Sequence, residues 1–235
     1  MNKVLSNIRK ELEANRDEHT KDTAQRFFKE KVKLYGTKTA VVTKISKKYF
    51  EEIKNLNKAE IFELCGQLFS SGYMEESFIA CNWSYFIREP FEETDLLIFE
   101  KWLEKYITNW ASCDTLCNHT IGAFLEKFPG YVGRLKTWTI SDNRWLRRAA
   151  AVSLIIPAKE GRFLKEAFEI ADLLMNDSDD LVQKGIGWLL KEASRTHQKE
   201  VFEYVLSNKG IMPRTALRYA LEKMPKEMKV KAMEK

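Results

Sequence analysis

The chain has 235 residues, 44% of them hydrophobic, which suffices for a substantial core without disulfides or metal ions. Only 10 glycines and 5 prolines are present, and apolar residues recur three and four positions apart, which argues against β-sheet and for an all-α protein. The formal net charge is +5, and the excess is C-terminal, because residues 121–235 hold 21 basic and 15 acidic residues.

Residues 1–55 are predicted to form a helical lead-in. The apolar pattern favours helices over 3–18, 21–33 and about 38–54. In the second of these, Phe27, Phe28 and Val32 lie at helical spacing before a break at Gly36.

From residue 58 onward the chain is predicted to fold as pairs of helices, each pair having the length of a helical repeat. The pairs are about 58–70 with 74–88, 92–107 with 111–127, 130–139 with 143–156, and 162–174 with 179–195. Two short helices, about 198–207 and 213–223, and a basic tail close the array, so residues 198–235 are expected to cap it.

Internal similarity supports a repeat architecture. Residues 142–149 align with residues 178–185 at an offset of 36, and in both segments a polar N-cap precedes an aromatic or apolar pair, two polar positions and small residues. Small residues at 149–151 and at Gly185 and Gly187 allow neighbouring helices to approach closely. We therefore expect one domain over 1–235, a HEAT-like helical-repeat solenoid, or α–α superhelix, with its repeats over 58–195.

The cysteines indicate neither a metal site nor a disulfide framework. Cys113, Cys117 and His119 lack a second pair that would complete four zinc ligands, and all four cysteines of the chain lie in apolar helical patterns. We interpret them as reduced core residues. The N-terminal segment turns polar too soon for a signal peptide, and the longest apolar run ends at Pro157, short of a bilayer span. We expect a cytoplasmic protein that does not bind a membrane.

In a solenoid of helix pairs, the second helices of successive pairs line one surface, commonly the concave one. We expect this concave groove to be basic and to collect residues from three such helices, namely Trp110 and Asp114, then Arg144, Arg147 and Arg148, then Lys184, Trp188 and Lys191. Arginines and lysines suit a phosphate backbone, and aromatic rings can pack against sugars or bases. A carboxylate in such a groove is out of place unless it serves a cationic ligand or transition state.

Structural roles are open for the same residues. Tryptophans at helical spacing are more often core side chains than ligand contacts. Asp114 could complement the dipole of its helix, and Arg147 and Arg148 could occupy an exposed face. Spacing alone does not choose between chemistry and structure.

At these residues the chain resembles the AlkD-type DNA alkylation repair proteins, HEAT-like glycosylases that act on alkylated purines. The resemblance covers nearly the whole length and is most specific at Trp110 with Asp114, in the segment 141–150 and in the segment 183–188. It implies that Asp114 is the catalytic aspartate, that Trp110 and Trp188 lie against the deoxyribose of the lesion, and that Arg148 contacts DNA at the catalytic site.

The sequence departs from the family pattern at three positions. Asn109 stands where an aromatic residue would extend the Trp110 pair, and Phe27 stands at a family position that bears tyrosine, so the ring is kept without its hydroxyl. Lys191 replaces an expected arginine, which keeps the charge but not the bidentate fork. Phe27, Arg144, Arg147, Lys184 and Lys191 are the DNA-binding candidates.

The resemblance implies a monofunctional DNA glycosylase that hydrolyses the glycosidic bond of cationic N3- or N7-alkylated purines in duplex DNA without flipping the base. It implies no metal and no nucleotide cofactor, and Gly185-Ile186-Gly187 lacks the third glycine of a dinucleotide fingerprint. A monomer bound to double-stranded DNA is expected. Two alternatives are a non-catalytic HEAT-repeat protein that binds bent, branched or damaged DNA, and a helical scaffold whose groove accepts an acidic peptide.

Overall fold

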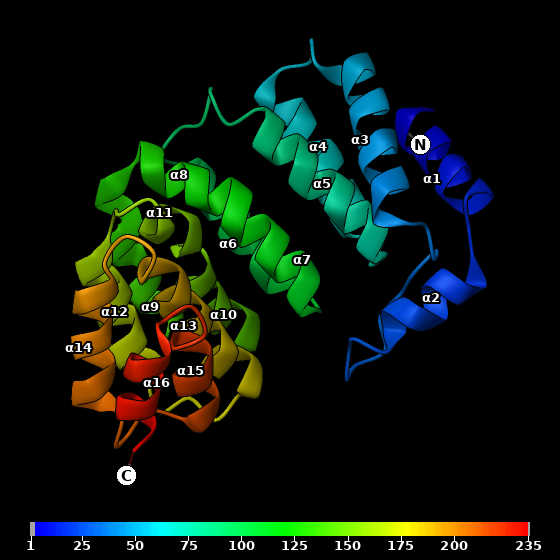
Figure 1. Ribbon diagram of the computed structural model, residues 1–235. Helices are drawn as coiled ribbons and strands as arrows, with labels where there is room; N and C mark the ends of the chain where they lie inside the picture. The colour runs from blue at the N-terminus through cyan, green and yellow to red at the C-terminus, as the bar shows by residue number, and fades with distance from the viewer. Residues whose placement is uncertain (1–2, 235) are drawn as a thin grey trace. The chain divides into compact units, whose positions relative to one another are not determined.

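The computed structural model describes residues 3–234, and these residues form an all-helical fold (Figure 1). No β-strand occurs among them apart from an isolated parallel bridge between Lys33 and Tyr73. The expected fold class is therefore confirmed. Within the same residues, no helix combines the length and the apolar character needed to cross a bilayer.

The chain divides into two compact units, a first unit that ends at Leu116 and a second that begins at Cys117. The first unit contains α1 (Lys3–Ala14), α2 (Glu18–Gln25), α3 (Thr39–Ile53), α4 (Lys58–Phe69), α5 (Met74–Phe86), α6 (Asp95–Lys105) and α7 (Trp110–Thr115). Here α5 is the central helix, because α3, α4 and α7 all pack against it. The fully buried Trp83 of α5 fixes the contact with α3 by donating from Nε1 to the Ser46 carbonyl oxygen over 2.9 Å.

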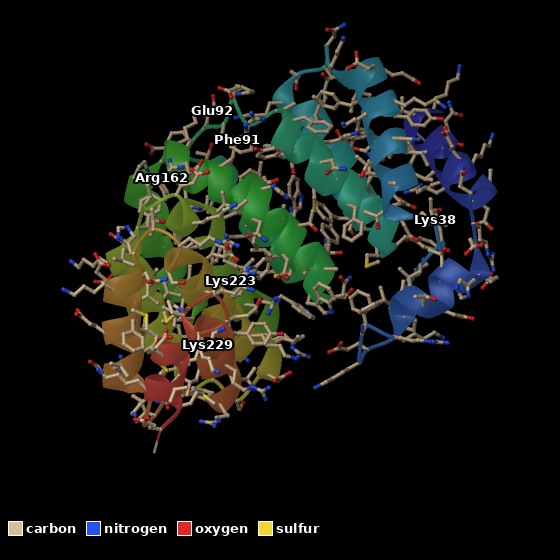
Figure 2. All side chains as sticks on the ribbon, in the orientation of Figure 1. Lys38, Phe91, Glu92, Arg162, Lys223 and Lys229 are labelled. Atoms are coloured by element: carbon tan, nitrogen blue, oxygen red, sulfur yellow. The ribbon has the colours of Figure 1, made fainter. Side chains whose placement is uncertain are left out.

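Aromatic side chains fill the core where α4 meets α6. Phe62 of α4 packs edge-on against Trp102 of α6, with ring centroids 5.4 Å apart. Phe91, in the loop before α6 (Figure 2), closes the cluster at 5.2 Å from the Phe99 ring. Burial of several large rings in one place supplies much of the apolar area that stabilises this unit.

The helix expected over 21–33 is wrong in its second half, since α2 ends at Gln25 and residues 26–33 leave the helix. The Gln25 side chain ends it by donating to the Glu30 carbonyl oxygen (2.8 Å) and accepting from the Val32 backbone N–H (3.0 Å). The chain turns inward as a result, and Val32 joins Leu34 and Met74 in a small buried cluster against which Phe28 packs.

Glu75 of α5 fastens the connection between α2 and α3. Its buried carboxylate accepts hydrogen bonds from three consecutive backbone N–H groups, those of Tyr35 (3.1 Å), Gly36 (2.8 Å) and Thr37 (3.2 Å). Gly36 has a φ of 89°, and an added Cβ there would lie 2.4 Å from the Asp17 carbonyl oxygen, so glycine is required. The connection is thus held at a defined place on α5.

The second unit is built around one long helix. After a π-helical segment over Leu116–Ile121, the elements are α8 (Gly122–Lys127), a 3₁₀ helix (Pro129–Arg134), α9 (Leu135–Trp138), α10 (Arg144–Val152), α11 (Ile155–Lys159), α12 (Leu164–Leu174), α13 (Asp180–Ala193), α14 (Gln198–Asn208), α15 (Arg214–Ala220) and α16 (Lys226–Met233). The central helix is α13, against which α10, α11, α12, α14 and α15 pack.

The repeat alignment is confirmed at its N-caps. The Asn143 side chain accepts from the Trp145 backbone N–H (2.9 Å), and the Asp179 side chain accepts from the Leu181 backbone N–H (2.8 Å), which is the same offset in each helix. Arg144 joins the two caps, because its Nε lies 2.8 Å from Oδ2 of Asp179.

The basic segment after residue 223 contains a further helix, α16, which the sequence pattern did not predict. Ala232 is buried and α16 packs against α14, which gives this polar segment an apolar contact that its composition does not reveal. All four cysteines are buried, as expected, and none forms a disulfide.

Candidate functional site

The short helix α7 presents the Trp110 and Asp114 pair. Asn109 is its N-cap, with extended backbone (φ −148°, ψ 157°) and an Oδ1 that accepts from the Ser112 backbone N–H over 2.9 Å. Trp110 is thereby the first residue of the helix, and Asp114 follows one turn later on the same side. The sequence prediction that Trp110 opens a helix is confirmed, while the role of Asn109 as a cap was missed.

The Trp110 indole is held by the segment that follows α2. Its ring stacks on Phe28 with centroids 5.2 Å apart and planes 24° apart. Its Nε1 donates to the Phe27 carbonyl oxygen over 3.3 Å. Two independent contacts therefore fix the ring orientation, one by its face and one by its polar edge.

Trp110 also forms a wall of an apolar cavity of about 410 Å³ in the first unit. The cavity lies between α2, the start of α3, α5 and α7, and its lining includes Phe27, Phe28, Met74, Phe78 and Trp110. Phe27 is 71% exposed at this cavity, which is unusual for a phenylalanine and leaves its ring available for an external contact.

Asp114 is only 8% exposed and stands among buried residues of α7, Ser112 and Cys113. A carboxylate in such a place interacts with a nearby positive charge through less water than a surface carboxylate does. The chain continues from α7 into the π-helical segment Leu116–Ile121. Single π-helical turns inside α-helices occur frequently at functional sites.

Arg148 lies in the second unit, packed between α10 and α13. Its side chain is largely buried at 5% exposure, and its Nη1 donates to the Leu181 carbonyl oxygen. Gly185 lies beside this side chain, and a Cβ at that position would be in ordinary van der Waals contact with Nη1 of Arg148, 3.6 Å away. Trp188, less than a turn beyond Gly185 on α13, is half-buried.

Arg144 and Arg147 of α10 are engaged by aspartates. Besides the Arg144–Asp179 pair, Nε of Arg147 lies 2.7 Å from Oδ2 of Asp177, and its Nη1 donates to the Ser141 carbonyl oxygen over 2.9 Å. These pairs tie the start of α10 to the loop before α13. The side chains of Arg144 and Arg147 both remain partly exposed to solvent.

The two lysines of α13 also have partners. Nζ of Lys184 lies 2.7 Å from Oδ2 of Asp180, and Nζ of Lys191 lies 3.3 Å from Oε2 of Glu222. Both pairs are at least partly exposed at the carboxylate, so each contributes little to stability and leaves the lysine able to exchange partners.

The residues singled out in the sequence therefore fall into two groups. The first unit brings together Trp110, Asp114 and Phe27, and the second brings together the basic residues of α10 and α13 with Trp188. Sequence reasoning missed Phe28, whose ring supports Trp110; the only signal was the aromatic doublet at 27–28. Among residues 3–234, no group of three or more His, Cys, Asp or Glu side chains is arranged to hold a metal ion.

Comparison with known proteins now bears on this geometry. A family model described as DNA alkylation repair enzyme matches residues 8–224. The chain belongs to the DNA alkylation repair enzyme family. The match spans both units and includes every candidate residue on α7, α10 and α13.

Solved structures support the fold of this DNA alkylation repair family member. A protein from Enterococcus faecalis named "Predicted DNA alkylation repair enzyme" superimposes with a TM-score of 0.80, covering 90% of this chain and 98% of that one at 16% identity. At such low identity the likeness concerns the fold alone. Comparison with curated protein sequences gives no match.

Proposed function

We propose that this DNA alkylation repair family member is a monofunctional glycosylase that releases N3- or N7-alkylated purines from duplex DNA. The observation that carries the proposal is the Trp110 ring, fixed by Phe28 and the Phe27 carbonyl oxygen, one helical turn before the largely buried Asp114. An aromatic face beside a sheltered carboxylate is a suitable surface for a sugar that becomes positively charged.

The substrate supplies most of the driving force. Alkylation at N3 or N7 makes the purine cationic, so its C1′–N bond breaks with the electron pair passing to the base, which leaves as a neutral molecule. The deoxyribose then carries positive charge, and the oxygen of water forms the new bond at C1′ while a proton is lost from that water. Acid catalysis of the leaving group is unnecessary, and stabilisation of the sugar cation is the main requirement.

In this proposal Asp114 stabilises the sugar cation, and it also orients the attacking water or accepts its proton. Trp110 and Trp188 are assigned to the sugar faces, and Arg148 to a phosphate at the lesion. Arg144, Arg147, Lys184, Lys191 and the exposed ring of Phe27 are assigned to the DNA backbone around it. No lysine lies beside Asp114 in the sequence, which favours hydrolysis over a Schiff-base lyase reaction.

The test is release of free base from a duplex that carries one N7-methylguanine, with wild-type protein, Asp114→Asn and a matched control, Glu52→Gln, at an exposed position of α3. We expect Asp114→Asn to slow release by about 10²–10³-fold with duplex binding retained, and Glu52→Gln to behave as wild type. Asp114→Asn removes the charge and keeps the shape, so a change in folding is not the expected cause.

The other outcomes reject the role of Asp114 or select a different function. Full activity in Asp114→Asn removes this residue from the mechanism. Salt-dependent duplex binding by the wild type without base release indicates the non-catalytic DNA-binding alternative. Absence of duplex binding even at low salt indicates the acidic-peptide scaffold.

A further inference from the structure

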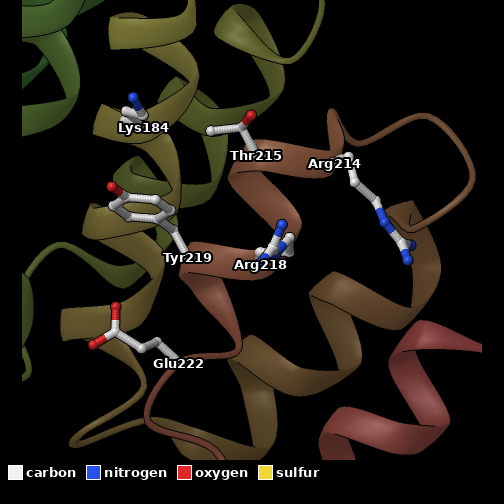
Figure 3. Close-up of a pocket in the computed structure, with 6 residues that line it drawn as sticks. All are labelled: Lys184, Arg214, Thr215, Arg218, Tyr219 and Glu222. Carbon is white, nitrogen blue, oxygen red and sulfur yellow. The ribbon is translucent and has the colours of Figure 1, made fainter.

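A cleft of about 480 Å³ beside α15 in the second unit lies largely outside the site described above. Lys184 of α13 and the α15 side chains line it, together with Glu222 just after the helix, and the full lining is Lys184, Arg214, Thr215, Arg218, Tyr219 and Glu222 (Figure 3). Only Lys184 among them was singled out from the sequence.

The cleft is positively charged after its own ion pairs are considered. Asp180 is paired with Lys184, and it accepts a long hydrogen bond of 3.5 Å from the Thr215 hydroxyl. Glu222 lies within reach of two lysines, 3.3 Å from Nζ of Lys191 and 3.9 Å from Nζ of Lys223. The nearby carboxylates are thus matched by lysines, and the two arginines of α15 remain in excess.

Arg214 and Arg218 are exposed and lie one turn apart on α15. Within residues 3–234, neither forms an ion pair or a side-chain hydrogen bond. Figure 3 shows Thr215, Tyr219 and Glu222 on the flank of α15 nearest to Lys184, whereas both arginines extend from the other flank. Side chains from both flanks line the cleft, which brings two guanidinium groups without a partner in the described part of the chain to its border beside an aromatic ring and a hydroxyl.

The position of α15 is firmly set. Gly187 of α13 lies directly under it, because a Cβ there would approach Cβ of Tyr219 to 2.5 Å and the Ala216 carbonyl oxygen to 2.7 Å. Lys191 stands over the Tyr219 ring at 5.9 Å from its centroid. A ligand would meet a preformed surface, which lowers the entropic cost of binding.

The surrounding sequence extends this charge. Residues 209–235 contain eight basic and three acidic residues, so this segment holds most of the C-terminal excess. Lys223 and Lys229, both seen in Figure 2, belong to it, and Lys229 donates to the Glu222 carbonyl oxygen over 3.0 Å. A net positive charge of this kind suits a repeating anion better than a single charged molecule.

We propose that the α15 cleft binds the phosphodiester backbone of a DNA strand, with Arg214 and Arg218 on successive phosphates and the Tyr219 ring, 37% exposed, against a sugar or base. Guanidinium groups match phosphate oxygens in a bidentate geometry, and sequence-independent aromatic contacts commonly accompany them. The inference rests on the proposed function in taking DNA as the ligand, but it requires no base release. The proposed cleft adds contacts from α15 to the DNA backbone contacts already assigned to α10 and α13.

The experiment measures duplex binding over a range of salt concentrations for wild type, Arg214→Ala/Arg218→Ala and the charge-matched control Lys165→Ala/Lys199→Ala. The control lysines are highly exposed on α12 and α14. Each phosphate contact contributes roughly 0.9 to the slope of log affinity against log salt. We expect Arg214→Ala/Arg218→Ala to reduce the magnitude of that slope by roughly 1.8 and the control variant to leave it unchanged. Arg214→Lys/Arg218→Lys should keep most of the slope.

An unchanged slope in Arg214→Ala/Arg218→Ala overturns the proposal, as does a wild type that binds no duplex. A separate titration uses inorganic phosphate. If Arg214→Ala/Arg218→Ala abolishes phosphate binding but leaves duplex binding unaffected, the cleft binds a free anion, and the proposal is also overturned. If the wild type releases no base but the salt dependence of its duplex binding falls in Arg214→Ala/Arg218→Ala, the DNA-binding role of the cleft is supported and the glycosylase proposal is rejected. Circular dichroism of each variant confirms that these exposed substitutions leave the fold intact.

Discussion

At the scale of single residues, the local chemistry of α7 depends on Asn109. The family resemblance marks this asparagine as a departure from an aromatic position, yet the structure uses its side chain to begin the helix. Asn109 is 3% exposed, so its amide reaches the Ser112 N–H in a place where water cannot substitute for it. A ring at this position could not make that bond, and the start of α7 with Trp110 would lose its anchor.

Asn109→Ala should therefore destabilise the protein by about 1 kcal/mol, the usual loss for an N-cap, and should also slow base release because α7 carries both Trp110 and Asp114. Unfolding in urea and release from an N7-methylguanine duplex measure the two effects. Asn109→Ser restores a capping oxygen and should recover most of the stability. Equal stability of the alanine and wild-type proteins would show that the cap contributes nothing.

At the scale of elements, the close approach of α13 and α15 is decided by Gly187. The backbone of α15 passes so near that the Ala216 Cα would lie 3.1 Å from a Cβ at this position. Glycine in a helix interior is ordinarily unfavourable, so its presence here reflects packing against a neighbouring backbone rather than local propensity.

Gly187→Ala should lower the free energy of unfolding by roughly 1–3 kcal/mol, since the obstructing atoms are Cβ of Tyr219 and the backbone of Ala216, which move only if α15 shifts. The matched control is Gly66→Ala on α4, where the nearest atom to an added Cβ is Nε1 of Trp102 at 3.8 Å. That substitution should be neutral or stabilising because alanine favours helix. Both are measured by chemical denaturation, and similar effects at the two positions would argue against a special contact at Gly187.

At the scale of the whole molecule, charge is distributed unevenly. The basic excess lies in the second half, whereas the N-terminal helices are joined by individual pairs such as Glu11 of α1 with Lys48 and Tyr49 of α3. Glu11 accepts from Nζ of Lys48 over 2.6 Å and from the Tyr49 hydroxyl over 2.9 Å. The hydrogen bond from Lys48 is the main cause that holds the pKa of Glu11 below its ordinary value, against desolvation.

This lowered pKa predicts a defined acid response. The unfolded chain binds a proton at Glu11 more readily than the folded one, so the contribution to stability is present above the ordinary pKa of 4.5 and is lost as pH falls through the folded value. Glu11→Gln should therefore reduce stability near neutral pH and flatten its decline in acid, whereas Glu52→Gln should follow wild type. Denaturation at a series of pH values measures this, and parallel curves for wild type and Glu11→Gln would contradict it.

The sequence by itself determined the helical class, the match of residues 142–149 to 178–185, and the placement of Trp110 and Asp114 on one helix. These features depend on periodicity and on contacts between residues two to four positions apart, so the residues involved can be recognised in the sequence. The family resemblance located the same residues because it rests on their order and spacing.

Only the tertiary structure decided where α2 ends, what supports Trp110 and which cations are already paired. Gln25 turns the chain so that Phe28 meets Trp110, 82 positions away, and Asp177 and Asp179 engage arginines 30 or more positions distant. The two arginines of α15 are free because no carboxylate of the described chain reaches them, which depends on folded distances. Long-range contacts leave no periodic trace in a sequence, so their partners emerge only when the chain is folded.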